Sequence, residues 1–351
     1  TPLTTYEDYA PYLGPKQDEI LPSKPVWWLH TSGKSGYGFK WVPFSQEAIS
    51  KLGECGMAGM VLGSSSRRGD FHYEVGDTLL CSVAPFPYIS GALAIAFEKE
   101  FEFVFLPSLE EADKLGFQER VQTGFQMSMR SGLDAFFGVA SVLAKIGEQF
   151  REGTGSSGFS TDMLHPRVLA RIVRALARSR LAGRNYLLPK DLWDVKGVAT
   201  GGMDTSIFRD QIEQDWGVSA IEAYAATDAL GFLAVQSWNT KGMTFFPDVN
   251  FLEFIPEEQS MRSREDPTFQ PATLLLDDLE PGKRYELVLT NLLGGIFVRY
   301  RIGDLVQIDS LQDEEIGVFL PQMSFYSRCD DVVDLAGFTR LTEKDIWQAL
   351  E

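Results

Sequence analysis

The chain has 351 residues, 44% of them hydrophobic, and its 49 acidic and 32 basic residues give a net charge of −17. This length allows a substantial buried core and predicts roughly two domains. The negative charge excludes general binding to nucleic acid or anionic membranes unless a local basic patch exists. No apolar run approaches the roughly 20 residues of a membrane span. Three scattered cysteines without a CxxC pair indicate a reducing, cytoplasmic setting.

The first part of the chain predicts helices and strands in alternation. Residues 1–25 are polar and rich in proline, which is typical of a short helix and a loop. VWWL and KWVPF, on either side of the glycine turn TSGKSG, predict a buried strand and a returning strand. Residues 77–106 predict strand, loop, helix and strand, and residues 117–150 are mostly helical in pattern, with a break at an SG pair. Residues 153–159 predict a surface loop.

The densest basic cluster of the chain contains Arg167, Arg171, Arg174, Arg178, Arg180 and Arg184. Their spacing leaves Leu164, Val168, Ile172 and Leu176 on the opposite face of a helix. A solvated amphipathic helix accounts for this pattern, and a surface for RNA or a partner protein is the alternative.

The second half turns from helices to strands. VKGVATGG predicts a strand that ends in a glycine pair, SIFRDQIEQDWG a helix, and SAIEAYAATDALGFLAVQ a strand with a polar turn. From residue 243 onward, strand patterns predict an antiparallel half that follows the alternating α/β half. The final LTEKDIWQALE predicts the first turns of a helix, with Thr342 and Asp345 as a capping pair. We expect this helix to open a further domain.

Four separated stretches have the composition of a nucleotide site. In the first, TSGKSGYGFK, glycines expose backbone N–H groups, and hydroxyls and cations come from Thr31, Ser32, Lys34, Ser35 and Lys40. A Walker loop is excluded, because Trp28 stands where that motif requires its first glycine. A plain glycine turn between strands is the alternative.

The other three stretches follow predicted strands. ATGGM places two glycines where a flat ring can lie on bare backbone, or where the chain simply turns tightly. EAYAATDALG offers the Tyr224 ring to a base, the Thr227 hydroxyl to a phosphate, and Asp228 to Mg²⁺ or to a helix N-terminus as a cap. VRYRIGD ends in Asp304, which can accept hydrogen bonds from both ribose hydroxyls or close a turn.

Together and in this order, the four stretches resemble the adenylate-forming enzymes, the superfamily of acyl-CoA synthetases and luciferase. The closer resemblance is to the GH3 (auxin-responsive) family of acyl-adenylating amide synthetases and its microbial relatives. That family's first loop has a Lys four places after its last glycine and a Pro three further on, as Lys40 and Pro43 stand after Gly36. FFPDVNFLEFIP and YELVLTNLLGGIFVRYRIGDLVQI look particularly like GH3 sequences. The resemblance covers nearly the whole chain.

The resemblance implies an α/β fold, with a large N-terminal adenylation domain of βαβ-type layered sheets plus a β-rich subdomain over residues 1–327. We expect part of the native N-terminal segment to be absent from this domain. A hinge around Asp330 would span residues 328–331. Residues 332–351 would begin a small C-terminal domain that is mostly missing.

The resemblance also assigns roles. The ATP phosphates would be held by Thr31, Ser32, Gly33, Lys34, Ser35, Gly36 and Lys40. The adenine would lie against Gly201, Gly202, Met203, Tyr224 and Ala225. Asp304 and Arg328 would bind the ribose. Lys40, Thr227 and Asp228 would act in catalysis, with Thr227 at the α-phosphate and Asp228 assisting Mg²⁺. Lys34 departs from the family's Thr or Ser. Asp228 departs from its Glu and is one methylene shorter.

The implied reaction joins a small carboxylic acid to AMP from ATP with Mg²⁺, and then transfers the acyl group to an amine. Transfer to coenzyme A, as in phenylacetate-type ligases, is one alternative. A non-catalytic nucleotide-binding or partner-docking module is another, and neither nucleic acid nor membrane is expected as a partner. An apolar or aromatic acid is suggested by Phe86, Tyr88, Ile89, Met127, Phe136 and Phe137, although each could equally be core.

Overall fold

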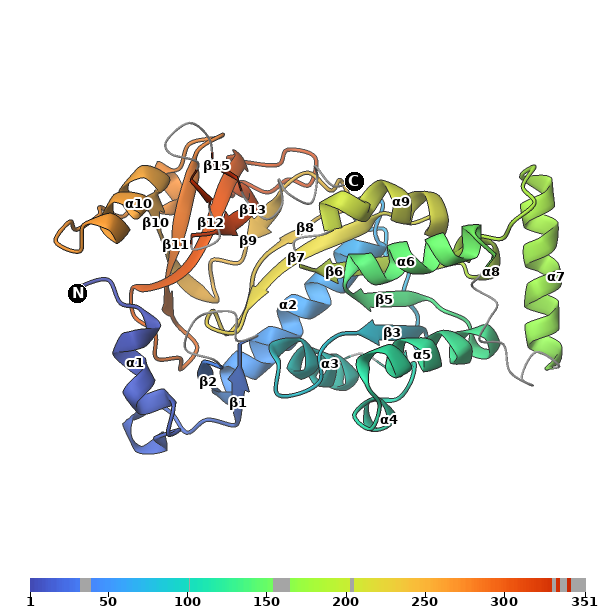
Figure 1. Ribbon diagram of the computed structural model, residues 1–351, viewed down its shortest axis with the longest axis horizontal. Helices are drawn as coiled ribbons and strands as arrows, with labels where there is room; N and C mark the ends of the chain where they lie inside the picture. Colours follow the sequence, from blue (N-terminus) through green and yellow to red (C-terminus); the bar gives the residue numbers. More distant parts are fainter. Residues whose placement is uncertain are drawn as a thin grey trace.

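The computed structural model describes residues 1–31, 39–100, 102–153, 165–202 and 205–329, together with the short strands β14 (Val333–Asp334) and β15 (Arg340–Leu341). Over these residues the main element is a mixed sheet of 11 strands in the order β10–β11–β12–β13–β9–β8–β7–β6–β5–β3–β4. The sheet is parallel from β4 to β7 and antiparallel from β7 to β10. Figure 1 shows these two parts side by side, with the β-rich part on the left.

The parallel part consists of β3 (Thr78–Ser82), β4 (Val104–Phe105), β5 (Ala135–Gly138), β6 (Gly197–Gly201) and β7 (Ala220–Ala226). Parallel neighbours need long crossover connections, and these contain most of the helices. They are α3 (Ile89–Glu100), α4 (Leu109–Ala112), α5 (Phe117–Ser131), α6 (Ala140–Arg151), α7 (Pro166–Leu181), α8 (Pro189–Leu192) and α9 (Thr205–Trp216). The long helix α2 (Gln46–Ser64) precedes β3 and lies across β6, β7 and β8.

The antiparallel part consists of β8 (Gly231–Gln236), β9 (Met243–Phe245), β10 (Asn250–Pro256), β11 (Arg284–Asn291), β12 (Tyr300–Ser310) and β13 (Gln322–Arg328). The helix α10 (Glu257–Glu265) and the 3-10 turn η3 (Leu276–Asp278) connect β10 to β11. At the N-terminal end lie α1 (Tyr6–Leu13), the 3-10 turn η1 (Asp18–Ile20) and the hairpin of β1 (Trp27–His30) and β2 (Trp41–Phe44). A bridge from Thr4 to Tyr300 ties this end to β12.

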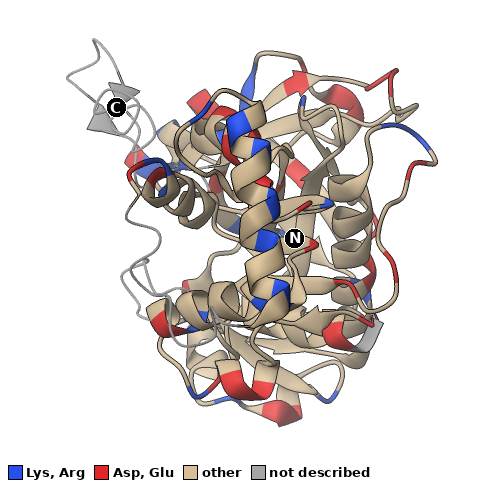
Figure 2. Cartoon of the chain, turned by 90° about the vertical axis from the view of Figure 1, so that its right-hand side faces the viewer, with Lys and Arg blue, Asp and Glu red and all other residues tan. Residues whose placement is uncertain are grey.

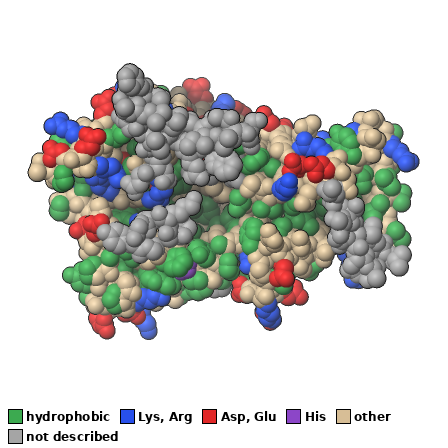
Figure 3. Space-filling view, in the orientation of Figure 1, with side chains coloured by type: hydrophobic (Ala, Val, Ile, Leu, Met, Phe, Trp, Pro, Cys, Tyr) green, Lys and Arg blue, Asp and Glu red, His purple; other side chains and the backbone are tan. Residues whose placement is uncertain are grey.

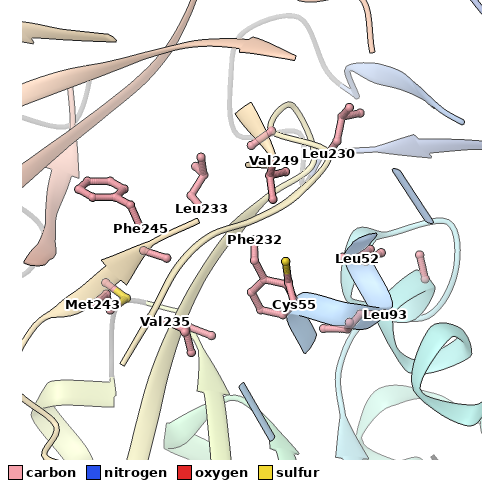
Figure 4. Close-up of a cluster of buried hydrophobic side chains, with 14 of the residues drawn as sticks. Leu52, Cys55, Leu93, Leu230, Phe232, Leu233, Val235, Met243, Phe245 and Val249 are labelled. Carbon is pink, nitrogen blue, oxygen red and sulfur yellow. The ribbon is translucent and has the colours of Figure 1, made fainter. Parts of the chain in front are cut away.

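Successive residues of the parallel strands face two different apolar clusters. Phe137 joins the cluster that contains α2 and α3, whereas Phe136 joins the cluster formed with α5, α6 and α9. In the first cluster, Leu52 of α2 and Leu93 of α3 gather with Phe232 of β8 (Figure 4). Complete burial of one such side chain contributes about 1.5–3 kcal/mol to stability. The parallel sheet is therefore covered on both faces.

The predicted α/β half followed by an antiparallel half is confirmed, but one strand contradicts the sequence prediction. Residues 117–150, predicted to be mostly helical, contain β5 between α5 and α6. A strand of four residues that is buried on both faces shows no alternation of polar and apolar residues, so its pattern cannot be distinguished from that of a buried helix.

The basic segment forms α7, as the amphipathic pattern predicts, and Figure 2 shows basic residues spaced along the whole helix. Val168 is buried and Ile172 is partly buried, but the side chain of Leu176 is 42% exposed, so its predicted place on the buried face was wrong. Ala175 occupies that face instead. Leu164 lies outside the described residues.

The surface over α1 and the β1–β2 hairpin carries several exposed apolar side chains, and Figure 3 shows them gathered at the lower left of this face.

Within the part of the chain that the structure describes, no helix combines the length and apolar character needed to cross a membrane.

Candidate active site

A mostly apolar cavity of about 420 Å³ lies at the carboxyl ends of β3, β5, β6 and β7. Ligands of open α/β sheets bind at this edge, because the strand ends and the following loops converge there. Its lining includes the apolar side chains of Leu52, Ile89, Leu93 and Phe137. It also includes Gly201, Gly202, Tyr224, Ala225 and Phe325. The cavity thus joins the predicted adenine residues to two of the predicted acyl residues.

The glycine pair at the end of β6 lines the cavity, and Gly201 has open space beside its backbone. A Cβ atom built at Gly201 would meet only the carbonyl oxygen of Ala223 within 4 Å, at 3.8 Å. Gly202 has a φ of +120°, a conformation that side-chain-bearing residues rarely adopt. Across the cavity, the ring of Tyr224 lies 5.7 Å from that of Phe325. A flat ring can therefore lie on bare backbone beside an aromatic wall.

The buried carboxylate of Asp304 forms a polar cluster with Tyr224 and Arg328, which are both partly buried. The Tyr224 hydroxyl donates to Oδ2 of Asp304 at 2.5 Å, and Nη1 of Arg328 lies 3.1 Å from Oδ1. Asp304 and Arg328 are direct cross-strand partners in β12 and β13. Burial raises the pKa of Asp304 to about 6, although Arg328 and the hydrogen bond from Tyr224 oppose this rise.

Asp228 forms a second buried cluster with Tyr300 and Lys40. The Tyr300 hydroxyl donates to Oδ2 of Asp228 at 2.7 Å and accepts from Nζ of Lys40 at 3.3 Å. Lys40 Nζ also lies 3.8 Å from the same carboxylate oxygen. Burial raises the pKa of Asp228, whereas Lys40 and Tyr300 favour its ionised form. The other oxygen, Oδ1, is buried without a hydrogen-bond partner among the described residues.

The turn that carries Thr227 and Asp228 is held by two buried amides. The backbone N–H of Leu230 donates to the carbonyl of Thr227 at 3.0 Å and closes the turn after β7. Asn291 donates to the carbonyl of Asp228 at 3.1 Å, and Asn250 donates to the carbonyl of Ala229 at 2.8 Å. These long-range contacts hold the backbone of the turn against β10 and β11.

The two ends of the first predicted loop meet. The Thr31 N–H donates to the carbonyl of Lys40 at 3.1 Å, and the Lys40 N–H donates to the Thr31 hydroxyl at 3.4 Å. The predicted phosphate-binding residues between them, Ser32, Gly33, Lys34, Ser35 and Gly36, lie outside the described residues, as do Met203 and Asp330. Lys40 itself is buried and faces the Asp228 cluster.

The structure separates the six residues predicted to hold the acid. Ile89 and Phe137 line the cavity. Phe136 lies on the opposite face of the sheet, because neighbouring residues of a strand point in opposite directions. Met127 is exposed on α5. Tyr88 packs 4.3 Å from the ring of His30, and Phe86 packs 5.8 Å from that of Trp27, so both lie beside the β1–β2 hairpin.

Sequence reasoning overlooked four residues of this site, Glu222, Asn250, Asn291 and Tyr300. Tyr300 precedes Asp304 by four residues within VRYRIGD, and this even spacing on a strand was a signal that both could face the same side. Glu222 lines the cavity two residues before Tyr224. The two asparagines had no local signal, because their contacts reach more than 20 residues along the chain.

Comparison with known proteins finds similar sequences and similar folds. Residues 243–328 match the model of the GH3 family central domain. The resemblance to the GH3 family is confirmed. Jasmonoyl–L-amino acid synthetase JAR4 of Nicotiana attenuata is 21% identical over 100% of this chain and 66% of its own length.

Two solved structures show the same fold over nearly the whole chain. The GH3.15 acyl acid amido synthetase in complex with 2,4-DB has a TM-score of 0.62, with 16% identity over 99% of this chain and 65% of that one. An open conformation of 2-hydroxyisobutyryl-CoA ligase, in complex with 2-HIB-AMP and CoA, has a TM-score of 0.64, with 16% identity over 99% and 64%. The chain therefore has the fold of the adenylate-forming enzymes, and it spans about two thirds of the length of these three proteins.

Proposed function

We propose that this GH3-like chain activates a carboxylic acid with ATP and then transfers the acyl group to an amine. The observation that carries the proposal is the hydrogen bond of buried Asp304 to Tyr224 in the cavity wall, with a second buried acid, Asp228, in the turn after the same strand. Asp304 with Tyr224 and Arg328 suits a sugar and a base, and Asp228 with Lys40 suits a phosphate with its cation. The cavity beyond Tyr224 suits an apolar acyl group.

ATP would bind across the carboxyl ends of the strands. Ionised Asp304 would accept hydrogen bonds from the ribose hydroxyls, with Arg328 beside it. The adenine would lie between the Gly201–Gly202 backbone and the ring of Tyr224. The phosphates would extend towards Lys40 and the loop that begins at Thr31. This assignment is supported by Tyr224, which lines the cavity and binds Asp304, and by Asp228, which lies in the turn that follows the strand of Tyr224.

The first half-reaction brings two anions together. An oxygen of the acid's carboxylate would attack the α-phosphorus, and the bond from that phosphorus to the pyrophosphate oxygen would break. Lys40 would offset the negative charge, and the Thr227 hydroxyl would contact the α-phosphate. The unpartnered Oδ1 of Asp228 fits a metal ligand, and Mg²⁺ there would supply further charge screening. Among the described residues, no group of three or more His, Cys, Asp or Glu could hold a metal ion.

In the second half-reaction an amine would attack the acyl carbonyl carbon, AMP would leave, and the amine proton would pass to solvent. Coenzyme A is the second candidate acceptor, since the likeness in fold to a CoA ligase is as strong as that to an amido synthetase. We further propose that residues 1–327 form the adenylation domain and that residues 328–331 act as its hinge. The hinge would begin at Arg328, where β13 ends beside Asp304.

Pyrophosphate release tests the adenylation. The chain is incubated with ATP, Mg²⁺ and a panel of aliphatic and aromatic acids, and the best acid is then tested with amino acids or with CoA while the product is identified by mass spectrometry. We expect acid-dependent pyrophosphate release and an amide product. A thioester as the sole product would reject the amine acceptor. ATP binding without turnover on any acid would favour a nucleotide-binding module instead.

A further inference from the structure

The side chain of Tyr300 places one hydroxyl between two charged groups in an otherwise apolar setting. Tyr300 is fully buried, and its ring stacks on that of Phe297 with centroids 4.2 Å apart and an interplanar angle of 23°. Tyr9 of α1 lies against the same ring at 6.3 Å. The ring is thus held on two sides, and the hydroxyl has a fixed position from which to contact Asp228 and Lys40.

This hydroxyl determines which carboxylate oxygen of Asp228 remains without a hydrogen bond. Its proton is donated to Oδ2, and its lone pair accepts from Lys40. Lys40 and Asp228 are themselves 3.8 Å apart, which is too long for a hydrogen bond, so Tyr300 makes the shorter contact to each of them. Oδ1 keeps no partner among the described residues, which costs free energy in a buried carboxylate unless a ligand supplies one.

Tyr300 also belongs to a reciprocal arrangement of two segments. In each segment a tyrosine precedes an aspartate by four residues, in YAATD over 224–228 and in YRIGD over 300–304. The Tyr224 hydroxyl binds Asp304 of the other segment, and the Tyr300 hydroxyl binds Asp228. The two acids of the site are therefore fixed relative to each other by two crossed hydrogen bonds.

We infer that Tyr300 is a positioning residue whose hydroxyl holds Asp228 by Oδ2 beside Lys40, so that Oδ1 is presented to the Mg²⁺ of a bound Mg²⁺–ATP. The inference rests on the proposed function and assigns a role to a residue that is not among the proposed ligand contacts. Removing a residue that hydrogen-bonds to a metal ligand and orients it typically lowers the metal affinity about 10–100-fold. Phenylalanine fills the same space without the hydroxyl, so Tyr300→Phe isolates this contribution.

The test compares Tyr300→Phe with Tyr285→Phe in the whole chain. Tyr285 is a matched control, because it is also buried in the antiparallel part and its hydroxyl has one hydrogen bond, from the Glu280 N–H at 3.1 Å. Calorimetric titration of Mg²⁺ into protein saturated with ATP gives the half-saturating Mg²⁺ concentration. We expect Tyr300→Phe to raise this concentration about 10-fold or more, with Tyr285→Phe at the wild-type value. The KM for the acid should stay unchanged.

An unchanged half-saturating Mg²⁺ concentration in folded Tyr300→Phe would overturn the inference. Asp228→Asn and the double variant complete a double-mutant cycle. This cycle tests the coupling between the two residues even if Tyr300→Phe lowers the stability of the fold. If Tyr300 acts through Asp228, Tyr300→Phe should have little further effect on Mg²⁺ binding in the Asp228→Asn background. Fully additive effects of the two substitutions on Mg²⁺ affinity would overturn the inference. A wild type that binds Mg²⁺–ATP but releases no pyrophosphate would reject the proposed adenylation, and the Mg²⁺ titration would still decide the role of Tyr300.

Discussion

Asp304→Asn tests the ribose assignment with the smallest change in shape. Asparagine keeps the volume of the side chain and one oxygen that can still accept from the Tyr224 hydroxyl. The substitution removes the negative charge that faces Arg328 and would accept from the ribose hydroxyls. A fall in ATP affinity is expected, because a neutral amide is a weaker acceptor than a carboxylate.

The magnitude follows from the kind of hydrogen bond that is lost. Hydrogen bonds to charged groups contribute about 1.5–3 kcal/mol each. Because Asp304 already holds Tyr224 and Arg328, we expect the loss for the ribose contacts together to stay within this range. The dissociation constant for ATP should rise roughly 10- to 150-fold.

The assay is a binding titration with ATP, 2′-deoxy-ATP and 3′-deoxy-ATP for both proteins. If Asp304 accepts from the ribose, wild type loses affinity when a hydroxyl is removed, and Asp304→Asn loses much less. Thermal melting checks that the variant is folded. Equal losses with the deoxy nucleotides in wild type and variant would refute the reasoning, since the carboxylate would then have no part in ribose binding.

The other predictions use different parts of the molecule. ATP affinity should fall as pH drops through about 6, where Asp304 takes up a proton, and binding titrations should show this slope in wild type but not in Asp304→Asn. The raised pKa of Asp304 also makes the free energy of unfolding depend on pH. The protonated side chain contributes stability that is complete below the ordinary pKa of 3.8 and is lost as pH rises through about 6. Denaturant unfolding of wild type and Asp304→Asn at several pH values should show this difference. Phe137→Ala should widen the cavity and shift pyrophosphate release towards bulkier acids, whereas Phe136→Ala should cost about 3–5 kcal/mol of stability without changing the preference among acids. Glu286→Gln should lower the melting temperature, because the buried carboxylate pairs with Arg301 at 2.6 Å, and breaking a buried pair costs about 3–5 kcal/mol.

Most of the fold was predictable from local patterns. The β1–β2 hairpin, α7 and the strands after residue 243 all followed from apolar runs with glycine, proline or polar residues at their ends. β5 was not predictable in this way, because its type is decided by its neighbours: β3 and β6 pair with it on both sides. A short apolar segment forms a strand when neighbouring strands can hydrogen-bond to its backbone.

Some residues of the candidate site could be selected from the sequence, because their residue types suit the proposed chemistry. Asp304 and Tyr224 were selected separately, and the structure places them in one cluster. The partner of Asp228 was not predictable, since nothing in the local sequence says that a tyrosine 72 residues away will bind it. Phe136 and Phe137 show the same limit, because only the direction of the strand decides which of the two faces the cavity.

The contact between Tyr224 and Asp304 also says how the sheet must be shaped. β7 and β12 are separated in the sheet by β8, β9 and β13. In a flat sheet, four steps of about 4.8 Å would place these strands about 19 Å apart, which is more than a tyrosine and an aspartate can span. Yet the two side chains are in hydrogen-bond contact at 2.5 Å. The antiparallel part must therefore curve back over β7.

The narrow join between the two parts of the sheet permits this curvature. β9 has 3 residues, and β13 pairs with it through only Gln322 and Met323. Phe232, Phe245 and Met323 lie in the larger apolar cluster that this region shares with α2, so packing stabilises the curvature. The two Tyr–Asp hydrogen bonds then close it across the site. Because Asp304 and Asp228 come from opposite sides of this join, any loosening of β9 should disturb both of these acids together.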